Sequence, residues 1–599
     1  MTLRQELEVL FLSMQRTLIL KAVRLQLAWS SNESPYTLDA GSLLGSADED
    51  ELNRRLAWIK SQKARPLARW AMRLHLFLDN AQRLKSAALF VQAWYRALLW
   101  WILPSLRQRG YARWVRLHDS VGEVDLGEKP KADLILIDDG PAFNFKKSEF
   151  SGTVDRPYVI IQFAEGELSR DIDAKVNDFL SRNSQAEILY GDFDHTRWGR
   201  RVRPYFFSDW DIDSCLSQNF FSSIVLLRTE VFMKIPDQVL SSRRGLWAWL
   251  MKACILRDDR AEKMGHVPEI LFHKKEATQI DGLTGEWGRA CVEAYGDRLP
   301  NVQIINNKYG VLRALWPLPE RQPKVSLIVP TKDKSDLLRP LLEGLLHSTA
   351  YSDFEVLIVN NRSVEEATFR FFDEIQRDQR VRVLDYDAPF NYSAINNFAF
   401  SHSKGEIIGL LNNDIEILHS DWLTELVRDA LRPDVGAVGA KLLYRNGFIQ
   451  HAGVVLGLFQ VCAHIHRMEH GRSRGYCNRL LFTQQFSAVT GACLFVRRSV
   501  YEKVNGLDEE NLAVAYNDVD FCLRIKEAGW KILWSPNATL LHLESATRPP
   551  DSRPEQVLRY QKEVNYMRER WKSYLSTDPF YNRNLTKNSY HFELPNDRK

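Results

Sequence analysis

The stretch GLLNNDIEIL, residues 409–418, begins and ends like a buried strand but carries two amides and a carboxylate in its middle. Apolar runs of this kind, alternating with amphipathic helical stretches, are typical of α/β domains. In open α/β sheets, ligands bind at the carboxyl ends of the strands, because loops and unpaired backbone donors converge there. The position of Asn412, Asn413 and Asp414 at a strand end therefore predicts a binding site.

Two further strands in this part of the chain also end in polar residues. VPTKDK places Thr331 and Asp333 after one strand, and VNNRS places Asn360 and Asn361 after another. Each cluster alone is compatible with an ordinary turn, since Asn and Asp cap helices and tolerate turn geometry. Their recurrence at three strand ends favours one shared site.

Length and composition indicate a folded protein of several domains. The chain has 599 residues, of which 26% are charged and 45% apolar, and its formal net charge is +4. That charge is too small for the basic footprint of a nucleic-acid binder, so we expect no nucleic-acid partner. Periodicity and breakers predict a helical region over residues 1–115, α/β units over residues 116–316 and 323–550, and a helical tail over residues 551–599.

Cysteine usage and the N-terminal sequence favour a cytoplasmic location. The seven cysteines are scattered and form no C-x-x-C pair, and the first residues lack a secretory-signal pattern. No apolar run is long enough to span a bilayer. Residues 87–106 instead combine Trp100 and Trp101 with a narrow polar stripe and basic flanks. Peripheral contact with the cytoplasmic face of the inner membrane, or burial against the rest of the protein, would each explain that pattern.

The ordered motifs from residue 325 to residue 548 resemble those of family 2 glycosyltransferases with the GT-A fold, within which the rhamnosyltransferase-like enzymes of bacterial surface polysaccharide assembly are most similar. The motifs are VSLIVPTKDK, FEVLIVNNRS, FNYSAINNFA, GLLNNDIEIL, SAVTGACLFVRRSVYEKVNGLDE, YNDVDFCLRIKEAGW and HLESATR. The resemblance implies a GT-A type α/β domain that binds a nucleotide sugar. Residues 132–274 resemble, more loosely, the upstream unit of long family members.

That upstream unit resembles a degenerate GT-A-like domain. VIIQFAEGEL stands where a working copy would have an acidic strand end, and RRGLWAWLMKA stands at the place of the base motif without an acid. Asp192 and Asp194 remain, but a pair of acids without a base supports binding at most. We expect this unit to serve as a scaffold or to contact acceptor or partners.

The resemblance also implies a role for each polar cluster of the second unit. Asp414, in the place of the family's D-x-D element, and His542 would hold Mg²⁺ or Mn²⁺. Asp518 would take the acceptor hydroxyl proton in an inverting transfer. The implied donor-binding residues are Pro330, Thr331, Asp333, Asn360, Asn361, Asn396, Asn412 and Asn413, and the implied acceptor-binding residues are His451, Gly491, Ala492, Asn517 and Asp520.

Two details of these motifs leave alternatives open. Asp520 is two positions from Asp518, so the two side chains would face different sides of a helix. Asp520 would either position the acceptor or stabilise the start of that helix. His464, His466 and His470 have partial metal-ligand spacing, but no carboxylate or thiolate partner is evident. We interpret that segment as a loop near the acceptor cleft.

The resemblance favours a metal-dependent, inverting glycosyltransferase that moves sugar from a nucleotide-sugar donor to a glycan or lipid-linked acceptor in O-antigen or capsule-like polysaccharide biosynthesis. The alternative is a non-catalytic scaffold that binds nucleotide sugar or carbohydrate, because asparagine replaces an acid at Asn360 and Asn412. A nucleotidyltransferase is disfavoured, since VPTKDKSDLL lacks a glycine-rich phosphate loop.

Overall fold

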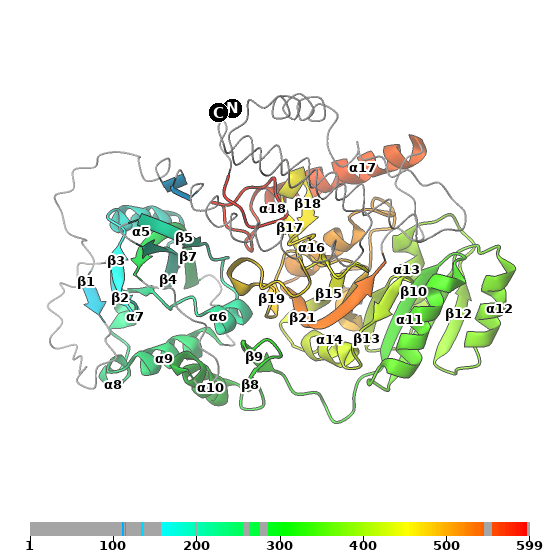
Figure 1. The fold of residues 1–599 in the computed structure, drawn as a ribbon, viewed down its shortest axis with the longest axis horizontal. Coiled ribbons are helices and arrows are strands. Elements are labelled where there is room, and N and C mark those ends of the chain that lie inside the picture. The colour runs from blue at the N-terminus through cyan, green and yellow to red at the C-terminus, as the bar shows by residue number, and fades with distance from the viewer. Residues whose placement is uncertain are drawn as a thin grey trace, which may run out of the picture. The chain divides into compact units, whose positions relative to one another are not determined.

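The computed structural model describes residues 111–112, 114–115, 133–136, 157–197, 200–255, 263–275, 285–543 and 554–595 (Figure 1). These residues all belong to one compact body, 110–599, which contains both predicted α/β units. The candidate membrane segment, residues 87–106, and almost all of the predicted helical N-terminal region lie outside the described residues. Among the residues described, no helix has the length and apolar character needed to cross a membrane.

The larger sheet is formed by residues 325–542. Its strand order is β12-β11-β10-β13-β20-β15-β21-β14. The strands are β10 Val325–Thr331, β11 Phe354–Asn360, β12 Val381–Asp385, β13 Ile407–Leu411, β14 Ile415–Ile417, β15 Val435–Leu443, β20 Cys493–Arg497 and β21 Lys531–His542. Strands β10 to β13 run parallel, with β10 between β11 and β13. The strand order therefore reverses at β10, which is the point where such sheets bind ligands.

Helices cover both faces of this sheet. They are α11 Ser335–Ser348, α12 Glu366–Ile375, α13 Tyr392–His402, α14 Trp422–Ala430, α15 Arg498–Lys503 and α16 Asn517–Glu527. Leu327 and Val329 of β10 pack in a core cluster with α11, α12 and α14, whereas Ile328 packs in a second cluster with α13 and α16. Because successive strand residues point to opposite faces, burial of both faces explains why these strands are apolar throughout.

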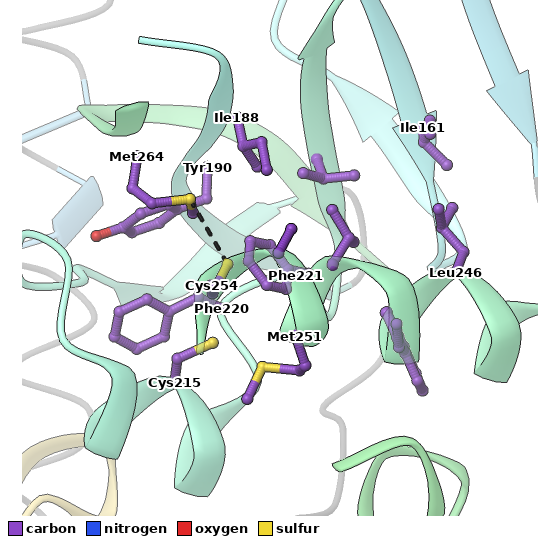
Figure 2. Packing of buried hydrophobic residues seen from close by; sticks show 14 of the residues in the cluster. Ile161, Ile188, Tyr190, Cys215, Phe220, Phe221, Leu246, Met251, Cys254 and Met264 are labelled. Carbon is purple, nitrogen blue, oxygen red and sulfur yellow. Dashed lines mark hydrogen bonds between the residues drawn. The ribbon is translucent and has the colours of Figure 1, made fainter. Parts of the chain in front are cut away.

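The smaller sheet has the order β1-β2-β6-β4-β7-β3, with β5 paired to β4. Its strands are β1 Asp133–Leu136, β2 Tyr158–Gln162, β3 Gly166–Leu168, β4 Ile188–Arg197, β5 Arg200–Tyr205, β6 Ile224–Arg228 and β7 Met264–Lys274. The helices around it are α5 Ile172–Arg182, α6 Ile212–Gln218, α9 Arg243–Cys254 and α10 Glu286–Arg298. Cys215 and Cys254 pack in its core, where Cys254 Sγ lies 3.7 Å from Met264 Sδ (Figure 2). All seven cysteines lie among the described residues, and none of them forms a disulfide.

The smaller sheet repeats part of the larger one. Strand β4 pairs parallel with β7, as β15 does with β21, and β2 pairs antiparallel with β6, as β13 does with β20. The antiparallel contact of β3 with β7 corresponds to that of β14 with β21. The predicted fold class, a GT-A type domain preceded by a related α/β unit, is therefore confirmed. The predicted domain boundaries stay predictions.

A buried ion pair joins the two units. Arg432, just after α14, donates from Nη1 and Nη2 to the two carboxylate oxygens of Asp213 on α6, at 2.8 and 2.9 Å. The side chains are 3% and 8% exposed, and Asp434 lies 3.3 Å from the same guanidinium. The charges of Arg432 and Asp213 are withdrawn from water, so each side chain needs the other to compensate its charge.

We expect Asp213→Ala to lower the free energy of unfolding by about 3 kcal/mol, because it leaves the buried Arg432 with Asp434 alone. Urea denaturation followed by tryptophan fluorescence measures this. The control is Glu366→Ala, which removes an exposed ion pair with Arg370 and should change the midpoint little. Equal midpoints for wild type and Asp213→Ala would contradict the assignment.

Candidate functional site

The end of β21 lies against the segment that follows β13. The antiparallel pairing of β14 with β21 sets Ile415 opposite His542. As a result, Asp414 Oδ1 lies 3.1 Å from His542 Nε2. The Nδ2 atom of Asn412 lies 3.1 Å from the same nitrogen. Three residues that the sequence pattern singled out are thus brought together.

The contact of His542 with Gln450 fixes one ring proton. Its Nδ1 lies 2.7 Å from Gln450 Oε1, and an amide oxygen only accepts, so the ring proton belongs on Nδ1. Asp414 Oδ1 is buried without a hydrogen-bond partner. In the neutral ring, Nε2 and Asp414 Oδ1 are two buried acceptor atoms that face each other at 3.1 Å, and a cation between them would stabilise both. An oxygen and an imidazole nitrogen, oriented by Gln450, fit a divalent metal ion.

The ends of β10 and β13 are joined by a hydrogen bond from Asn413 Nδ2 to Thr331 Oγ1 at 2.9 Å. At the end of β11, Asn360 Nδ2 donates to Asp385 Oδ1 at 2.8 Å. Asp385 is the last residue of β12, and its side chain is exposed. The sequence analysis missed it, although it too follows an apolar strand. Four strand ends therefore contribute polar groups to one edge of the sheet.

Several predicted donor-binding residues hold the surrounding loops. Asp333 accepts at Oδ1 from the backbone of Val364 and Glu365. Asn361 donates to the carbonyl oxygens of Tyr386 and Ala388. Pro330 is a half-buried residue of β10, and the buried Asn396 donates to the Tyr392 carbonyl inside α13. In the present arrangement these side chains shape the edge of the sheet rather than project from it.

Asp518 lies in the first turn of α16 and faces the loop before β20. Its Oδ2 accepts from Gly491 N at 2.8 Å, and its Oδ1 accepts from Val519 N at 2.9 Å. A Cβ atom on Gly491 would lie 3.4 Å from Asp518 Cβ and 3.3 Å from the Tyr392 hydroxyl. The glycine therefore permits a close approach to a half-buried carboxylate.

Asp520 is placed differently from Asp518. It is fully buried, and it accepts from Arg524 Nε at 2.7 Å and from Trp571 Nε1 at 2.9 Å. Both oxygens are occupied, so the contacts favour the helix-stabilising alternative over contact with an acceptor. Asn517 is also buried and donates to the Val514 carbonyl.

The loop at residues 490–492 connects the two parts of the site. Asn412 N donates to Ala492 O at 3.1 Å, and Thr490 N donates to His451 Nε2 at 3.4 Å. His451 is buried, and burial lowers its pKa well below the ordinary value, so the ring is neutral. The predicted acceptor-binding residues His451, Gly491 and Ala492 therefore lie between Asp414 and Asp518.

The first unit keeps an acid but lacks the histidine at the corresponding positions. Lys275 N donates to Glu165 O at 3.0 Å, as Leu543 N does to Asp414 O at 3.1 Å. By this correspondence Glu165 matches Asp414, so an acid does follow the strand end in VIIQFAEGEL, against the expectation. Lys274, however, stands opposite Gly166 where His542 stands opposite Ile415. A lysine brings its own positive charge and leaves no imidazole ligand there.

Asp192 and Asp194 are buried in β4 and serve contacts within the protein. Asp192 lies 2.9 Å from His266 Nε2 and accepts from Asn582 of the C-terminal segment at 2.8 Å. Asp194 pairs with Arg201 at 2.5 Å and with His273 at 2.7 Å. The sequence-based idea that this acidic pair supports ligand binding is not favoured by these contacts.

His266 should make stability depend on pH. Burial alone would lower its pKa, but Asp192 and Asp209 raise it to about 9. Its folded pKa therefore exceeds the ordinary unfolded value of about 6.5. Its stabilising contribution is complete below about pH 6.5 and falls as pH rises toward 9, by up to about 1.4 kcal/mol per pH unit.

We therefore expect His266→Gln to destabilise the protein most near pH 6 and least near pH 9. Melting temperatures of wild type and variant across this range measure the difference. A difference that stays constant or grows with pH would contradict the charged state of His266.

The fold and the site define the class of protein. A doubly covered α/β sheet carries, at its strand-reversal point, an acid and histidine pair beside a carboxylate at a helix start. Residues 323–562 match the family model described as "Glycosyltransferase like family 2". This part of the chain is a glycosyltransferase domain of family 2, so the resemblance is confirmed.

Two relatives match beyond this domain. The chain is 34% identical over 532 residues to "Uncharacterized protein y4gI" of Sinorhizobium fredii, and the matched region covers 84% of this chain and 57% of that protein. It is 34% identical over 442 residues to "O-antigen biosynthesis protein RfbC" of Myxococcus xanthus, and this match covers 71% of this chain and 33% of that protein. The chain thus spans about half and one third of the lengths of these relatives.

Among solved structures, the mannosyltransferase PcManGT of Pyrobaculum calidifontis, in complex with GDP-Man and Mn²⁺, is 18% identical with a TM-score of 0.32, covering 43% of this chain and 67% of that one. GalNAc-T7 with UDP, GalNAc and Mn²⁺ is 14% identical with a TM-score of 0.34, covering 42% and 50%. Both scores are low, so nothing about the donor, metal or acceptor of this chain follows from them.

Proposed function

We propose that this protein is a metal-dependent, inverting glycosyltransferase that uses a nucleotide-sugar donor. The observation that carries the proposal is the buried pair of acceptor atoms, Asp414 Oδ1 and His542 Nε2, at 3.1 Å. Asp518 stands across the 490–492 loop from this pair. An inverting transfer needs a metal ion that stabilises the leaving diphosphate and a base that takes the acceptor proton. The pair of Asp414 and His542 suits the first function, and Asp518 suits the second.

Asp414 and His542 would hold Mg²⁺ or Mn²⁺, which when bound supplies positive charge to the departing diphosphate. Gln450 keeps His542 in the tautomer whose Nε2 can ligate. Thr331, Asn360, Asn413 and Asp385 surround the strand ends where the nucleotide would lie. Asn360 binds Asp385, which leaves the second carboxylate oxygen of Asp385 for a nucleobase N–H group.

Asp518 is the proposed general base. Backbone N–H groups of Gly491 and Val519 fix its carboxylate. A positioned carboxylate can accept the hydroxyl proton as the acceptor oxygen attacks the anomeric carbon from the side opposite the diphosphate. Asp520 anchors the same helix through Arg524 and Trp571.

The acceptor is proposed to be a glycan or a lipid-linked sugar of surface polysaccharide assembly. The printed name of the Myxococcus relative, an O-antigen biosynthesis protein, supports this context. Transfer of rhamnose rests on family resemblance alone. A cytoplasmic location and membrane contact through residues 87–106 stay predictions.

A panel of nucleotide sugars tests the function without an acceptor. We expect slow release of nucleotide from one donor, dependent on Mn²⁺ or Mg²⁺. Asp414→Asn and His542→Ala should lose metal-dependent nucleotide binding and hydrolysis. Glu165→Gln is the matched control, because this exposed carboxylate holds the corresponding place in the first unit and should leave both intact.

The same panel separates the alternative, a non-catalytic scaffold. Metal-dependent binding of nucleotide without release from any donor, and without transfer to lipid-linked acceptors, would favour the scaffold. Equal losses of nucleotide binding and hydrolysis in Glu165→Gln and Asp414→Asn would mean that the site had been assigned to the wrong α/β unit.

We expect Asp518→Asn to lower the transfer rate by about 10² to 10⁴-fold while donor affinity stays unchanged, because the base contacts the acceptor proton and not the diphosphate. Transfer rates and donor dissociation constants measure this. Glu527→Gln, an exposed carboxylate at the other end of α16, is the control and should remain active. A near wild-type rate for Asp518→Asn would place the base elsewhere.

A further inference from the structure

Two histidines and a glutamate that are not part of the site described above come together. His466 Nδ1 lies 2.7 Å from Glu469 Oε1, and His591 Nδ1 lies 3.2 Å from the same oxygen. The three ligand atoms all lie within 4.8 Å of one another. Glu469 is the carboxylate partner, and His591 the further nitrogen, that the spacing of His466 and His470 alone did not reveal.

The cluster joins two segments distant in sequence. His466 and Glu469 follow β18 (Cys462–His464), whereas His591 belongs to the segment after α18 (Lys572–Ser576). His466 N donates to Tyr590 O at 2.7 Å, which fixes His591 beside the loop. Phe592 stacks on Tyr476 with ring centroids 5.0 Å apart. The backbone therefore holds the three side chains near each other without an ion.

The chemical types of the three side chains are those of metal ligands, since imidazole nitrogens and a carboxylate oxygen bind transition-metal ions in proteins. The side chain of His466 is 1% exposed, and those of Glu469 and His591 are 25% and 32% exposed. The cluster is therefore only partly open to water.

We propose that His466, Glu469 and His591 bind one zinc ion that ties the C-terminal segment to the loop after β18. Imidazole nitrogen and carboxylate oxygen are zinc ligands, whereas Mg²⁺ prefers oxygen alone. The partly exposed His591 (32%) leaves the fourth position of a tetrahedral ion open to water.

Zinc binding requires only small movements. Ligand atoms about 2.1 Å from a tetrahedral ion are about 3.4 Å apart, compared with 2.7 and 3.2 Å in the hydrogen-bonded cluster. When the two Nδ1 atoms become ligands, the ring protons of His466 and His591 that face Glu469 move to Nε2. Nε2 of His466 is buried without a hydrogen-bond partner, so its N–H group stays unsatisfied there and the bonds to zinc must offset that cost.

Zinc content of the full chain tests the proposal. Protein with its purification tag removed is stripped with chelator, given zinc chloride, dialysed, and analysed by elemental mass spectrometry. We expect His591→Ala and Glu469→Gln to retain one zinc fewer per chain than wild type. His470→Ala is the matched control, because this neighbouring histidine is exposed and outside the cluster. Any zinc held by Asp414 and His542 contributes equally to all samples.

Melting temperature gives an independent measurement. Zinc should stabilise wild type and His470→Ala more than His591→Ala, since a ligand of the folded state raises its stability. Mn²⁺ should not reproduce this difference. Equal zinc content and equal zinc-induced shifts in all variants would overturn the proposal and leave a hydrogen-bonded cluster. Neither result depends on glycosyl transfer, so the proposed function is tested separately.

Discussion

The pairing of β21 with both β15 and β14 is the constraint on which the site depends. This strand has 12 residues, and its pairing with β15 shifts register between Ala440 and Lys441 before it continues to His542. The shift and the length together carry His542 across the sheet to Asp414. A shorter strand would end before it reached Asp414, and a strand displaced by a single residue would turn the imidazole to the other face.

The C-terminal segment stabilises the same region from outside the sheet. Trp571 donates to the buried Asp520, and Val514 N donates to Glu563 on α17 (Pro554–Arg570). These contacts hold α16 and the loop before it, and with them Asp518. The segment then reaches Asp192 of the first unit through Asn582. Stability and the geometry of the proposed base are therefore coupled.

The two units show how one arrangement of strands can carry different chemistry. Both sheets place an acid after the strand end, but Lys274 takes the place of His542, and α9 begins with Arg243 and Arg244 where α16 carries Asp518. An ammonium group stands in place of a metal ligand, and no carboxylate stands in place of the base, so these differences favour a scaffold role for the first unit, which stays a prediction. The buried pair of Arg432 with Asp213 attaches it to the second unit.

The sequence by itself determined the fold class and the family, because strand periodicity and polar strand ends are local patterns, and several ordered motifs together are specific. It also indicated Asp414, His542 and Asp518 as candidates, whose roles stay predictions. Only the tertiary structure decided that Asp385 joins the strand ends, that Asp520 is buried against Trp571, and that Glu469 and His591 meet His466. These contacts join residues far apart in the chain or facing different sides of a helix or loop, so they depend on register, bulges and packing that no local pattern encodes.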